Sequence, residues 1–538
     1  MYKRSYSRVV ETVLMMPASL VSSWAALLVI HGMTSVCSFQ CPELSPCECR
    51  IEEDGRRILD CDNTGISEIP DLQGIPQQTV GLITLRNNSI RNISADTFDG
   101  LDVAELDLSY NILTNIASNA FQHVKESISK LVMDGVGISF KNKLAFLENM
   151  TSLVELSLND NVGFPIHLPN GFFKNMNLNS LRTLSLKRCQ MLILGELAFV
   201  GLDNLEELDI SHNDLSSIPS ALLHLRSLKT LIISHNKELT YIHHLAFEKM
   251  SQLTELHMGH SNIEYIEDNA FDGLENSLEV LDMNHCSLSF GHFSVLQTLK
   301  HLRKLDLSYN RISHIRNESF GDLEAIEDLD IGGNPIIFTA TMFRGLENKL
   351  KILRIQSMNR STLPLESLSL LNSLEILDAS KNKFSSIYDG FFSGVSASTI
   401  WMTDMKIKTV EAAAFNDLQP PISLNLDNNA IRDLSFVVKV KACSLDTLSL
   451  KGNPLTCDCV ISIITKSNMV KHLSGTCANK GYTGKSITTV GVALQADRDC
   501  QIESEDIYTC GACVTFPRGT IYLVIALFIK IFVIPELL

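Results

Sequence analysis

One apolar pattern recurs along most of the chain and limits what the chain can fold into. Its first copy is formed by Val80, Ile83, Leu85, Asn88, Ile90, Ile93, Phe98 and Leu101. Sixteen copies begin at residues 80, 103, 128, 153, 181, 205, 228, 253, 278, 302, 326, 350, 374, 397, 421 and 445, and all but one of the spacings lie between 23 and 25 residues. A fixed period of this length predicts a solenoid, because one unit cannot bury its apolar face and only stacked units form a core.

The copies resemble the leucine-rich repeat, LxxLxLxxNxL followed by FxxL, over roughly residues 80 to 500. The resemblance implies an α/β, β-rich solenoid, a curved horseshoe with a parallel concave sheet of about sixteen short strands and disulfide caps at both ends. Asparagine recurs at position nine, where it can satisfy backbone groups of neighbouring turns. These residues are Asn88, Asn111, Asn161, Asn213, Asn236, Asn310, Asn334, Asn382, Asn429 and Asn453. A phenylalanine predicted to stack on the convex side recurs at Phe98, Phe121, Phe199, Phe247, Phe271, Phe320, Phe343, Phe392 and Phe415.

The charge balance indicates an extracellular role without nucleic acid. The formal charge is −16, from 61 acidic and 45 basic residues, so phosphate backbones would be repelled over most of the surface. The chain has no glycine-rich phosphate loop and no lysine or arginine stripe. A length of 538 residues normally suggests several domains, but the repeat favours one elongated body.

The first residues are typical of a secretory signal. Lys3, Arg4 and Arg8 precede an apolar run over 20–30, and small residues follow up to Ser38. We therefore predict a signal peptide over 1–38 that is cleaved after Ser38. The alternative, a transmembrane anchor, requires about 20 apolar residues, and this run is shorter.

Cysteines gather on both sides of the repeats, where the ends of a solenoid core would otherwise meet water. We predict an N-terminal cap over 39–78, repeats over 79–452 and a C-terminal cap over 453–500. Four cysteines allow three connectivities per cap. In the family that the caps resemble, the first pairs with the third and the second with the fourth, which implies Cys41–Cys49, Cys47–Cys61, Cys457–Cys477 and Cys459–Cys500. Zinc binding is disfavoured, because no histidine stands at ligand spacing. The roles of Cys443, Cys510 and Cys513 are left open.

Five N-x-S/T sequons fit passage through the secretory pathway: Asn87, Asn92, Asn149, Asn317 and Asn359. Near the C-terminus, a spacer over 501–520 precedes an apolar tail over 521–538. Small residues, a spacer and an apolar tail are typical of a GPI-attachment signal, with cleavage near Gly511. Lys530 departs from that pattern, so a single-pass anchor and a shortened C-terminus remain alternatives.

An enzyme is not expected, and no cofactor or metal is predicted. The pair His285 and Cys286 suggests a thiol activated by imidazole. Cys286, like Cys189, however, stands at the inward position nine. We therefore interpret both as buried structural thiols.

The concave sheet carries the candidate ligand-binding residues. Position five faces outward in every repeat and presents Asp282, Asp306 and Asp330 on three consecutive strands, then Asp378 and Trp401. Carboxylates in a row could bind a cation or a basic ligand. The alternative is that aspartate is simply the commonest residue at this position and keeps the face soluble. An outward tryptophan in a polar sheet is a contact candidate.

A second column stands at position eight and contains His212, His235, His260 and His285 in four successive repeats. Four imidazoles could together bind a metal or gain charge at mildly acidic pH, with pKa values near ~6.5. The alternative is that this position accepts any polar residue before the asparagine.

These observations predict a cell-surface or secreted binding protein that recognises a macromolecular ligand through its concave and lateral faces. Its architecture resembles that of chaoptin, the Slit proteins and Toll ectodomains, which implies an adhesion, co-receptor or recognition role. The partner is expected to be a protein, and the acidic column favours one with a basic surface. A soluble accessory or matrix scaffold subunit is the alternative. Fold-level resemblance does not name the ligand.

Overall fold

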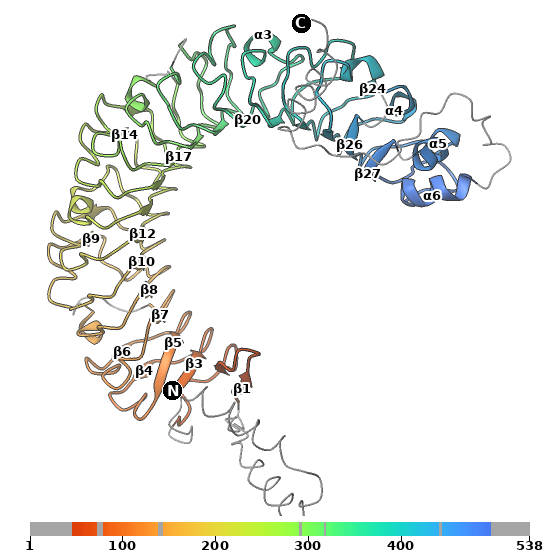
Figure 1. Cartoon of the computed structure of the whole chain (residues 1–538). Helices are drawn as coiled ribbons and strands as arrows, with labels where there is room; N and C mark the ends of the chain where they lie inside the picture. The colour runs from red at the N-terminus through yellow and green to blue at the C-terminus, as the bar shows by residue number, and fades with distance from the viewer. Residues whose placement is uncertain are drawn as a thin grey trace, which may run out of the picture.

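The computed structural model describes residues 46–72, 79–137, 144–289, 293–316, 319–440, 444–467 and 469–495. The repeats wind into an arc, with the strands of the main sheet along its inner side (Figure 1). Each of the sixteen repeats contributes one strand: β3 (Thr79–Thr84), β5 (Asp102–Asp107), β7 (Lys130–Val132), β8 (Glu155–Ser157), β10 (Thr183–Ser185), β12 (Glu207–Asp209), β13 (Thr230–Ile232), β15 (Glu255–His257), β17 (Val280–Asp282), β18 (Lys304–Asp306), β19 (Asp328–Asp330), β20 (Ile352–Arg354), β21 (Ile376–Asp378), β23 (Thr399–Trp401), β25 (Ile422–Asn425) and β26 (Leu445–Ser449). All of these strands pair in parallel, which confirms the predicted horseshoe.

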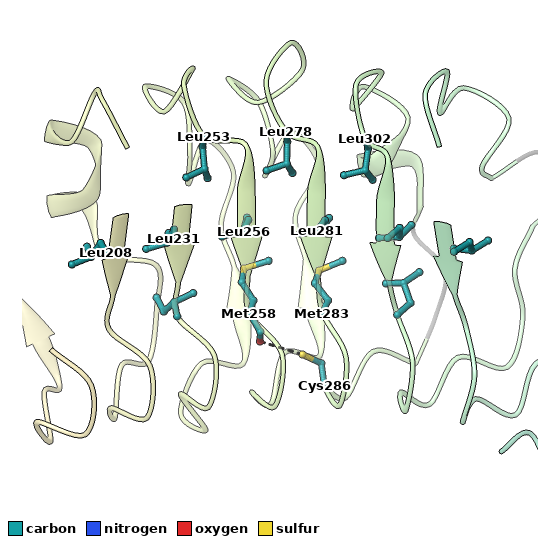
Figure 2. Packing of buried hydrophobic residues seen from close by; sticks show 14 of the residues in the cluster. Leu208, Leu231, Leu253, Leu256, Met258, Leu278, Leu281, Met283, Cys286 and Leu302 are labelled. Carbon is teal, nitrogen blue, oxygen red and sulfur yellow. Dashed lines mark hydrogen bonds between the residues drawn. The ribbon is translucent and has the colours of Figure 1, made fainter. Parts of the chain in front are cut away.

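The strands are in register because the same leucine of each repeat enters the core. Leu281 pairs with Leu305, and Leu305 with Leu329. All three are fully buried, while the residues before and after each leucine face outward on the inner side of the arc. Figure 2 shows this packing for neighbouring repeats. Register is fixed because a slip by one residue would carry every leucine to the solvent face.

Additional strands close both ends of the sheet. At the N-terminal end, β1 (Glu48–Ile51) and β2 (Arg57–Asp60) form an antiparallel hairpin, and β2 continues in parallel onto β3. At the C-terminal end, β27 (Val470–Ser474) follows β26. Helices α5 (Cys459–Ser467) and α6 (Ile487–Leu494) lie beyond it (Figure 1). These elements cover apolar surface that the terminal repeats would otherwise expose.

Disulfide bonds lie near both ends of the solenoid. Cys47 is bonded to Cys61, and Cys457 to Cys477, which are two of the four pairs that the resemblance implies. Cys49 and Cys459 are also disulfide-bonded. The partners expected for them, Cys41 and Cys500, lie outside the described residues, as do Cys443, Cys510 and Cys513.

The outer part of the arc carries short, less regular elements. Parallel two-stranded pairs are formed by β4 (Asn92–Ile93) with β6 (Asn115–Ile116), β9 (His167–Leu168) with β11 (Ile193–Leu194), β14 (Tyr241–Ile242) with β16 (Tyr265–Ile266), and β22 (Ser386–Ile387) with β24 (Thr409–Val410). Single helical turns are η2 (Ala145–Leu147), η3 (Ser220–His224), η4 (Phe293–Leu296), α3 (Leu365–Leu368), η5 (Ala412–Phe415) and α4 (Ser435–Lys439). Labels β4, β6, β9 and β14 mark this outer side in Figure 1.

Two ladders inside the solenoid follow the sequence prediction. The Nδ2 group of Asn310 donates hydrogen bonds to the carbonyl oxygens of Met283 and Leu307, both at 2.9 Å, and its Oδ1 accepts one from the N–H of Leu288 at 3.1 Å. This confirms that position nine satisfies the backbone of adjacent turns. The phenylalanines are buried and stack in places, as in the Phe98–Phe121 pair with ring centroids 5.7 Å apart.

Several sequence predictions concern parts of the chain that the structure does not describe. The signal peptide over 1–38, the spacer over 501–520, the apolar tail over 521–538 and the sequon at Asn317 all lie outside the described residues. Among the described residues, no helix is both long and apolar enough to span a membrane.

Candidate ligand-binding surface

Position five of each repeat forms one column on the concave face. Asp282, Asp306 and Asp330 pair in register on β17, β18 and β19, so the structure brings these three carboxylates side by side. Arg354 of β20 follows Asp330 in the column and separates it from Asp378. The predicted acidic run is therefore interrupted by a cation.

The aspartates also hold the ends of their own strands. In each case Oδ1 accepts a hydrogen bond from the backbone N–H two residues further on, at 3.0 Å for Asp282 and at 2.9 Å for Asp306, Asp330 and Asp378. Aspartate side chains commonly cap a turn in this way. The frequency of aspartate at position five thus has a structural cause. This bond occupies one oxygen of each carboxylate.

Asp330 is the most enclosed carboxylate of the column, with 8% of its surface exposed. Burial and the neighbouring Asp306 raise its pKa to about 6, although the N–H of Gly332 and the amide of Gln356 oppose the shift. The Nε2 group of Gln356 donates to both oxygens of Asp330 at 3.1 Å. The charged form of Asp330 is therefore destabilised relative to that of a free aspartate.

Asp282 has the opposite shift. Although burial raises its pKa, hydrogen bonds from His257 and from the N–H of Asn284 lower the pKa below the usual aspartate value. The same contact raises the pKa of His257, whose Nδ1 lies 3.7 Å from Oδ2 of Asp282. This carboxylate is thus partly neutralised from within the sheet.

Sequence reasoning missed Arg354, although the residue stands at position five like the aspartates around it. Its guanidinium forms an ion pair with Asp328 on the neighbouring strand β19. The comparison along position five alone could have found Arg354, but the pairing with Asp328 required the register of the two strands. Arg354 therefore pairs with the carboxylate of Asp328. Its strand provides no second cation to pair with Asp330 or Asp378.

Trp401 lies on β23, in register between Asp378 and Asn425. Its side chain is 36% exposed, whereas Ile400 beside it is fully buried. On the preceding strand the outward residues are Ile376 and Asp378. The tryptophan thus presents an aromatic surface to solvent beside an aliphatic and an acidic side chain, a combination typical of contact residues in interfaces.

The position-eight histidines form a continuous stack along one edge of the concave face. Ring centroids are 3.9 Å apart between His212 and His235 and 4.4 Å apart between successive rings from His235 through His260 and His285 to Tyr309. The interplanar angles are 11° or less. We call these five residues the ring stack. All five have positive φ angles, so each repeat turns in the left-handed conformation at this point.

Three histidines of the ring stack have a pKa below the ordinary histidine value. Burial and the neighbouring His212 and His260 lower the pKa of His235 to about 4. Burial also lowers the pKa values of His212 and His285. The expectation of charging near the unperturbed pKa is therefore wrong for His235, and burial shifts the pKa values of His212 and His285 in the same direction.

Glycines accommodate the tyrosines that occupy the same column. A Cβ atom at Gly333 would lie 2.5 Å from the ring of Tyr309, and one at Gly135 would lie 2.8 Å from the ring of Tyr110. The tyrosine hydroxyls reach across these glycines. That of Tyr309 lies 3.2 Å from Oγ of Ser357, and that of Tyr110 donates to Asp160 at 3.3 Å.

The structure does not support metal binding or thiol chemistry at the residues considered from the sequence. Within the described ranges, no group of three or more His, Cys, Asp or Glu side chains is arranged to hold a metal ion. Cys286 is 7% exposed and donates through Sγ to the carbonyl oxygen of Met258, as Figure 2 shows. Burial raises the pKa values of Cys189 and Cys286 to about 12. Both cysteines are buried and unpaired, as predicted for structural thiols.

The described sequons lie away from the strands of the later repeats. Asn87 occupies the position-eight column in the first repeat, with a φ of 54°. Asn92 begins β4 on the outer side, and Asn149 and Asn359 stand in loops. No sequon falls on the concave strands from β17 to β26.

Comparisons with known proteins agree with this architecture. The leucine rich repeat family model matches residues 179–237, 226–288 and 276–336, and the model of the BspA type leucine rich repeat region matches residues 80–189. The repeats, the parallel sheet and the disulfide bonds near both ends identify the chain as an extracellular leucine-rich-repeat protein.

Relatives share the repeats at low identity. The chain is 24% identical to the CD180 antigen of Mus musculus over 436 residues, which cover 73% of this chain and 64% of that protein. It is 25% identical over 479 residues to the transforming growth factor beta activator LRRC33 of Danio rerio, covering 81% of this chain and 62% of that protein. Identity to chaoptin of Drosophila melanogaster is 29% over 231 residues, or 42% and 17% of the two chains. The chain thus spans less than two thirds of each of these relatives.

Proposed function

We propose that this protein recognises a protein ligand through the concave face of repeats nine to fourteen, either at the cell surface or after secretion. The surface consists of Asp282, Asp306, Asp330, Asp378 and Trp401, which we call the Asp–Trp surface. The observation that carries the proposal is Trp401, a large aromatic side chain left 36% exposed in the middle of a polar sheet. Burying such a side chain in an interface removes apolar area from water.

The charges of the surface favour a basic ligand. The outward residues of β17 to β21 include five carboxylates, at 282, 306, 328, 330 and 378, against Lys304 and Arg354. Arg354 is already paired with Asp328. The two cations therefore leave an excess of negative charge beside Trp401. Such an excess accelerates the encounter with a basic partner and favours its correct orientation.

A glycan placed beside Trp401 tests the proposal directly. The substitution Asp378→Asn creates the sequon Asn-Ala-Ser on β21, so expression in a secretory host would add a glycan to the concave face. The double substitution Asp378→Asn/Ser380→Ala removes the same charge without creating a sequon. Lys249→Asn creates the sequon Asn-Met-Ser on an exposed turn that follows Phe247.

The readout is binding of each variant to a panel of extracellular proteins displayed on cells. We expect a partner of the wild-type chain to lose binding to the glycosylated Asp378→Asn variant and to retain it with the other two. If the partner tolerates the glycan at 378 and is lost with the glycan at 249, recognition occurs on the outer side and the Asp–Trp surface is not the ligand site.

Membrane attachment through the C-terminal tail remains a prediction. We propose attachment through a GPI anchor, supported by the small residues near Gly511, the spacer and the apolar run that follows it. Release of the protein from intact cells by phosphatidylinositol-specific phospholipase would support this attachment. Retention on treated cells would instead favour a transmembrane segment.

A further inference from the structure

A strand on the outer side of the arc has one edge without a partner. β11 pairs with β9, where the N–H of Gly195 donates to the carbonyl oxygen of Leu168 at 2.7 Å. β9 is labelled on the outer side in Figure 1. On its other edge, β11 faces the turn formed by 215–220. Among the described residues, no backbone hydrogen bond joins Leu194 to that turn.

The cause of the open edge is a proline. Gly195 and Ala117 occupy equivalent positions in their repeats. Each stands six residues after the position-nine residue, which is Cys189 in one repeat and Asn111 in the other. Both donate an N–H across to the preceding turn; for Ala117 the acceptor is Ile93, at 3.0 Å. Pro219 stands six residues after Asn213 and has no N–H to donate.

The sheet therefore ends at β11, and the chain continues into η3 instead. The carbonyl group of Leu194 is left facing an interrupted turn. An unpaired strand edge of this kind is available to an extended segment of another chain.

A pocket of about 330 Å³ occupies this gap and is lined by 192–194 and 215–220. Exposed apolar side chains surround it: Leu192 is 42% exposed and Ile193 53% exposed. Ile166 on the preceding turn is 48% exposed, and its carbonyl oxygen accepts the N–H of Leu192 at 2.9 Å. Three exposed apolar side chains thus stand on the two neighbouring turns beside the pocket.

Two acidic side chains border the pocket. Residues 189 to 225 contain no lysine or arginine. Glu196 follows β11 and Asp214 precedes the facing turn, and both are exposed. Within the described part of the chain, neither forms an ion pair. Two carboxylates without an ion pair border a pocket that exposed apolar side chains flank, which complements a segment that carries basic residues around an apolar one.

We propose that this pocket binds an extended segment of a partner protein, which adds to the free edge of β11. The segment places one large apolar side chain between Ile193 and the 215–220 turn, and lysine or arginine residues beside Glu196 and Asp214. Main-chain hydrogen bonds supply affinity in strand addition, and alternate side chains supply specificity. The site is separate from the Asp–Trp surface and does not depend on it.

The probe is a blocked, fluorescent heptapeptide with a central leucine flanked by alternating threonine and lysine residues. A second peptide has glutamate in place of lysine, and a third has the lysine sequence with N-methylated backbone amides. Fluorescence anisotropy measures the binding of each peptide to the purified protein. We expect the lysine peptide to bind at least about tenfold more tightly than the other two, because they lack the charges or the main-chain donors.

Matched variants locate the binding site. Ile193→Ser should weaken binding of the lysine peptide, whereas Ile337→Ser, at a residue 58% exposed elsewhere, should leave it unchanged. The double charge reversal Glu196→Lys/Asp214→Lys should transfer the preference to the glutamate peptide. Equal binding of all three peptides, no binding by the wild-type protein, or equal loss in the two serine variants would each overturn the proposal. Trp401→Ala should not affect any of these measurements.

Discussion

Two stretches of the concave face use their charged residues differently. In repeats three to seven, outward charges pair across neighbouring strands, as Lys130 does with Glu155 at 2.6 Å. Glu206 likewise contacts Arg182 at 2.9 Å and Lys229 at 2.6 Å. In repeats nine to eleven, three aspartates stand side by side instead. Several charges of the first stretch are therefore satisfied by ion pairs, whereas Asp306 and Asp330 form none among the described residues.

The two stretches also respond to pH in opposite directions. His235 has its pKa lowered to about 4, so its neutral ring belongs to the folded state. The contribution of His235 to stability is present above its pKa in the unfolded state, near 6.5. This contribution is lost as pH falls through its pKa in the folded state. Asp330 has its pKa raised to about 6, so its protonated form is favoured on folding. Its contribution is present below about 3.8 and is lost as pH rises through the folded value.

The largest expected effect is on stability, and it shows whether one end of the solenoid can be destabilised without the other. Replacing Cys457 and Cys477 by alanine removes a disulfide at the C-terminal end, which typically costs about 2–5 kcal/mol of unfolding free energy. Because a solenoid repeat contacts only its neighbours, hydrogen exchange should accelerate in β25 to β27 and remain unchanged in β5 to β8. Uniform acceleration along the whole chain would show that the solenoid unfolds as one unit.

The second prediction concerns the buried carboxylate. Asp330→Asn should raise the free energy of unfolding at pH 7 by roughly 1–3 kcal/mol, since each unit of pKa shift corresponds to about 1.4 kcal/mol. Asparagine keeps the acceptor that caps the strand, as Asn425 shows by accepting the N–H of Asp427 at 3.0 Å. The gain should disappear below pH 4, where wild-type Asp330 is protonated. Thermal melting between pH 4 and 7 measures this, and a stability loss at pH 7 would contradict the prediction.

The third prediction separates exposed aromatic residues at the two ends of the repeats. Trp401→Ala should weaken ligand binding by more than ~1 kcal/mol, as expected for a contact hot spot. Tyr110→Ala, at a residue 41% exposed in repeat two, is the matched control and should leave affinity unchanged. Isothermal titration with the identified ligand measures both. A larger effect at Tyr110 would move the ligand site to the N-terminal repeats.

The fourth prediction concerns the ring stack. His235→Tyr keeps an aromatic ring in a column that already contains Tyr110 and Tyr309, and it removes the group whose pKa is lowered. Between pH 6.5 and 4 the variant should therefore lose about 1 kcal/mol less stability than the wild type, allowing for partial solvent screening. Denaturant titrations at the two pH values provide the measurement. An unchanged difference would mean that the stacked imidazoles titrate as free histidines do.

The fold could be predicted from the sequence because every repeat carries the same apolar pattern. Leu281, Leu305 and Leu329 recur at one position, and their burial is a local consequence of the pattern. The asparagine ladder followed for the same reason. The disulfide pairs Cys47–Cys61 and Cys457–Cys477 were implied by family resemblance, since spacing alone left three connectivities.

The properties of the candidate site were harder to predict from the sequence, because they depend on contacts between residues of different repeats. The pKa shift of Asp330 depends on its burial and on Asp306 one strand away. The pairing of Arg354 with Asp328 likewise needs the register of two strands. The open edge of β11 results from Pro219 in the next repeat, an effect that a reading of each repeat by itself does not include.

The smallest expected effect concerns the rate of association. Asp282→Asn/Asp330→Asn removes two charges from the Asp–Trp surface without creating a sequon, whereas Asp306→Asn would create Asn-Leu-Ser and add a glycan. The double variant should slow association with a basic ligand a few-fold at low ionic strength, and the difference should fade above about 0.15 M salt. Glu155→Gln is the control, because that carboxylate is already paired with Lys130. Surface plasmon resonance at several salt concentrations separates the association rate from the dissociation rate. If Glu155→Gln slowed association as much as the double variant, pairing within the sheet would not distinguish the two stretches, and the ligand would respond only to net charge.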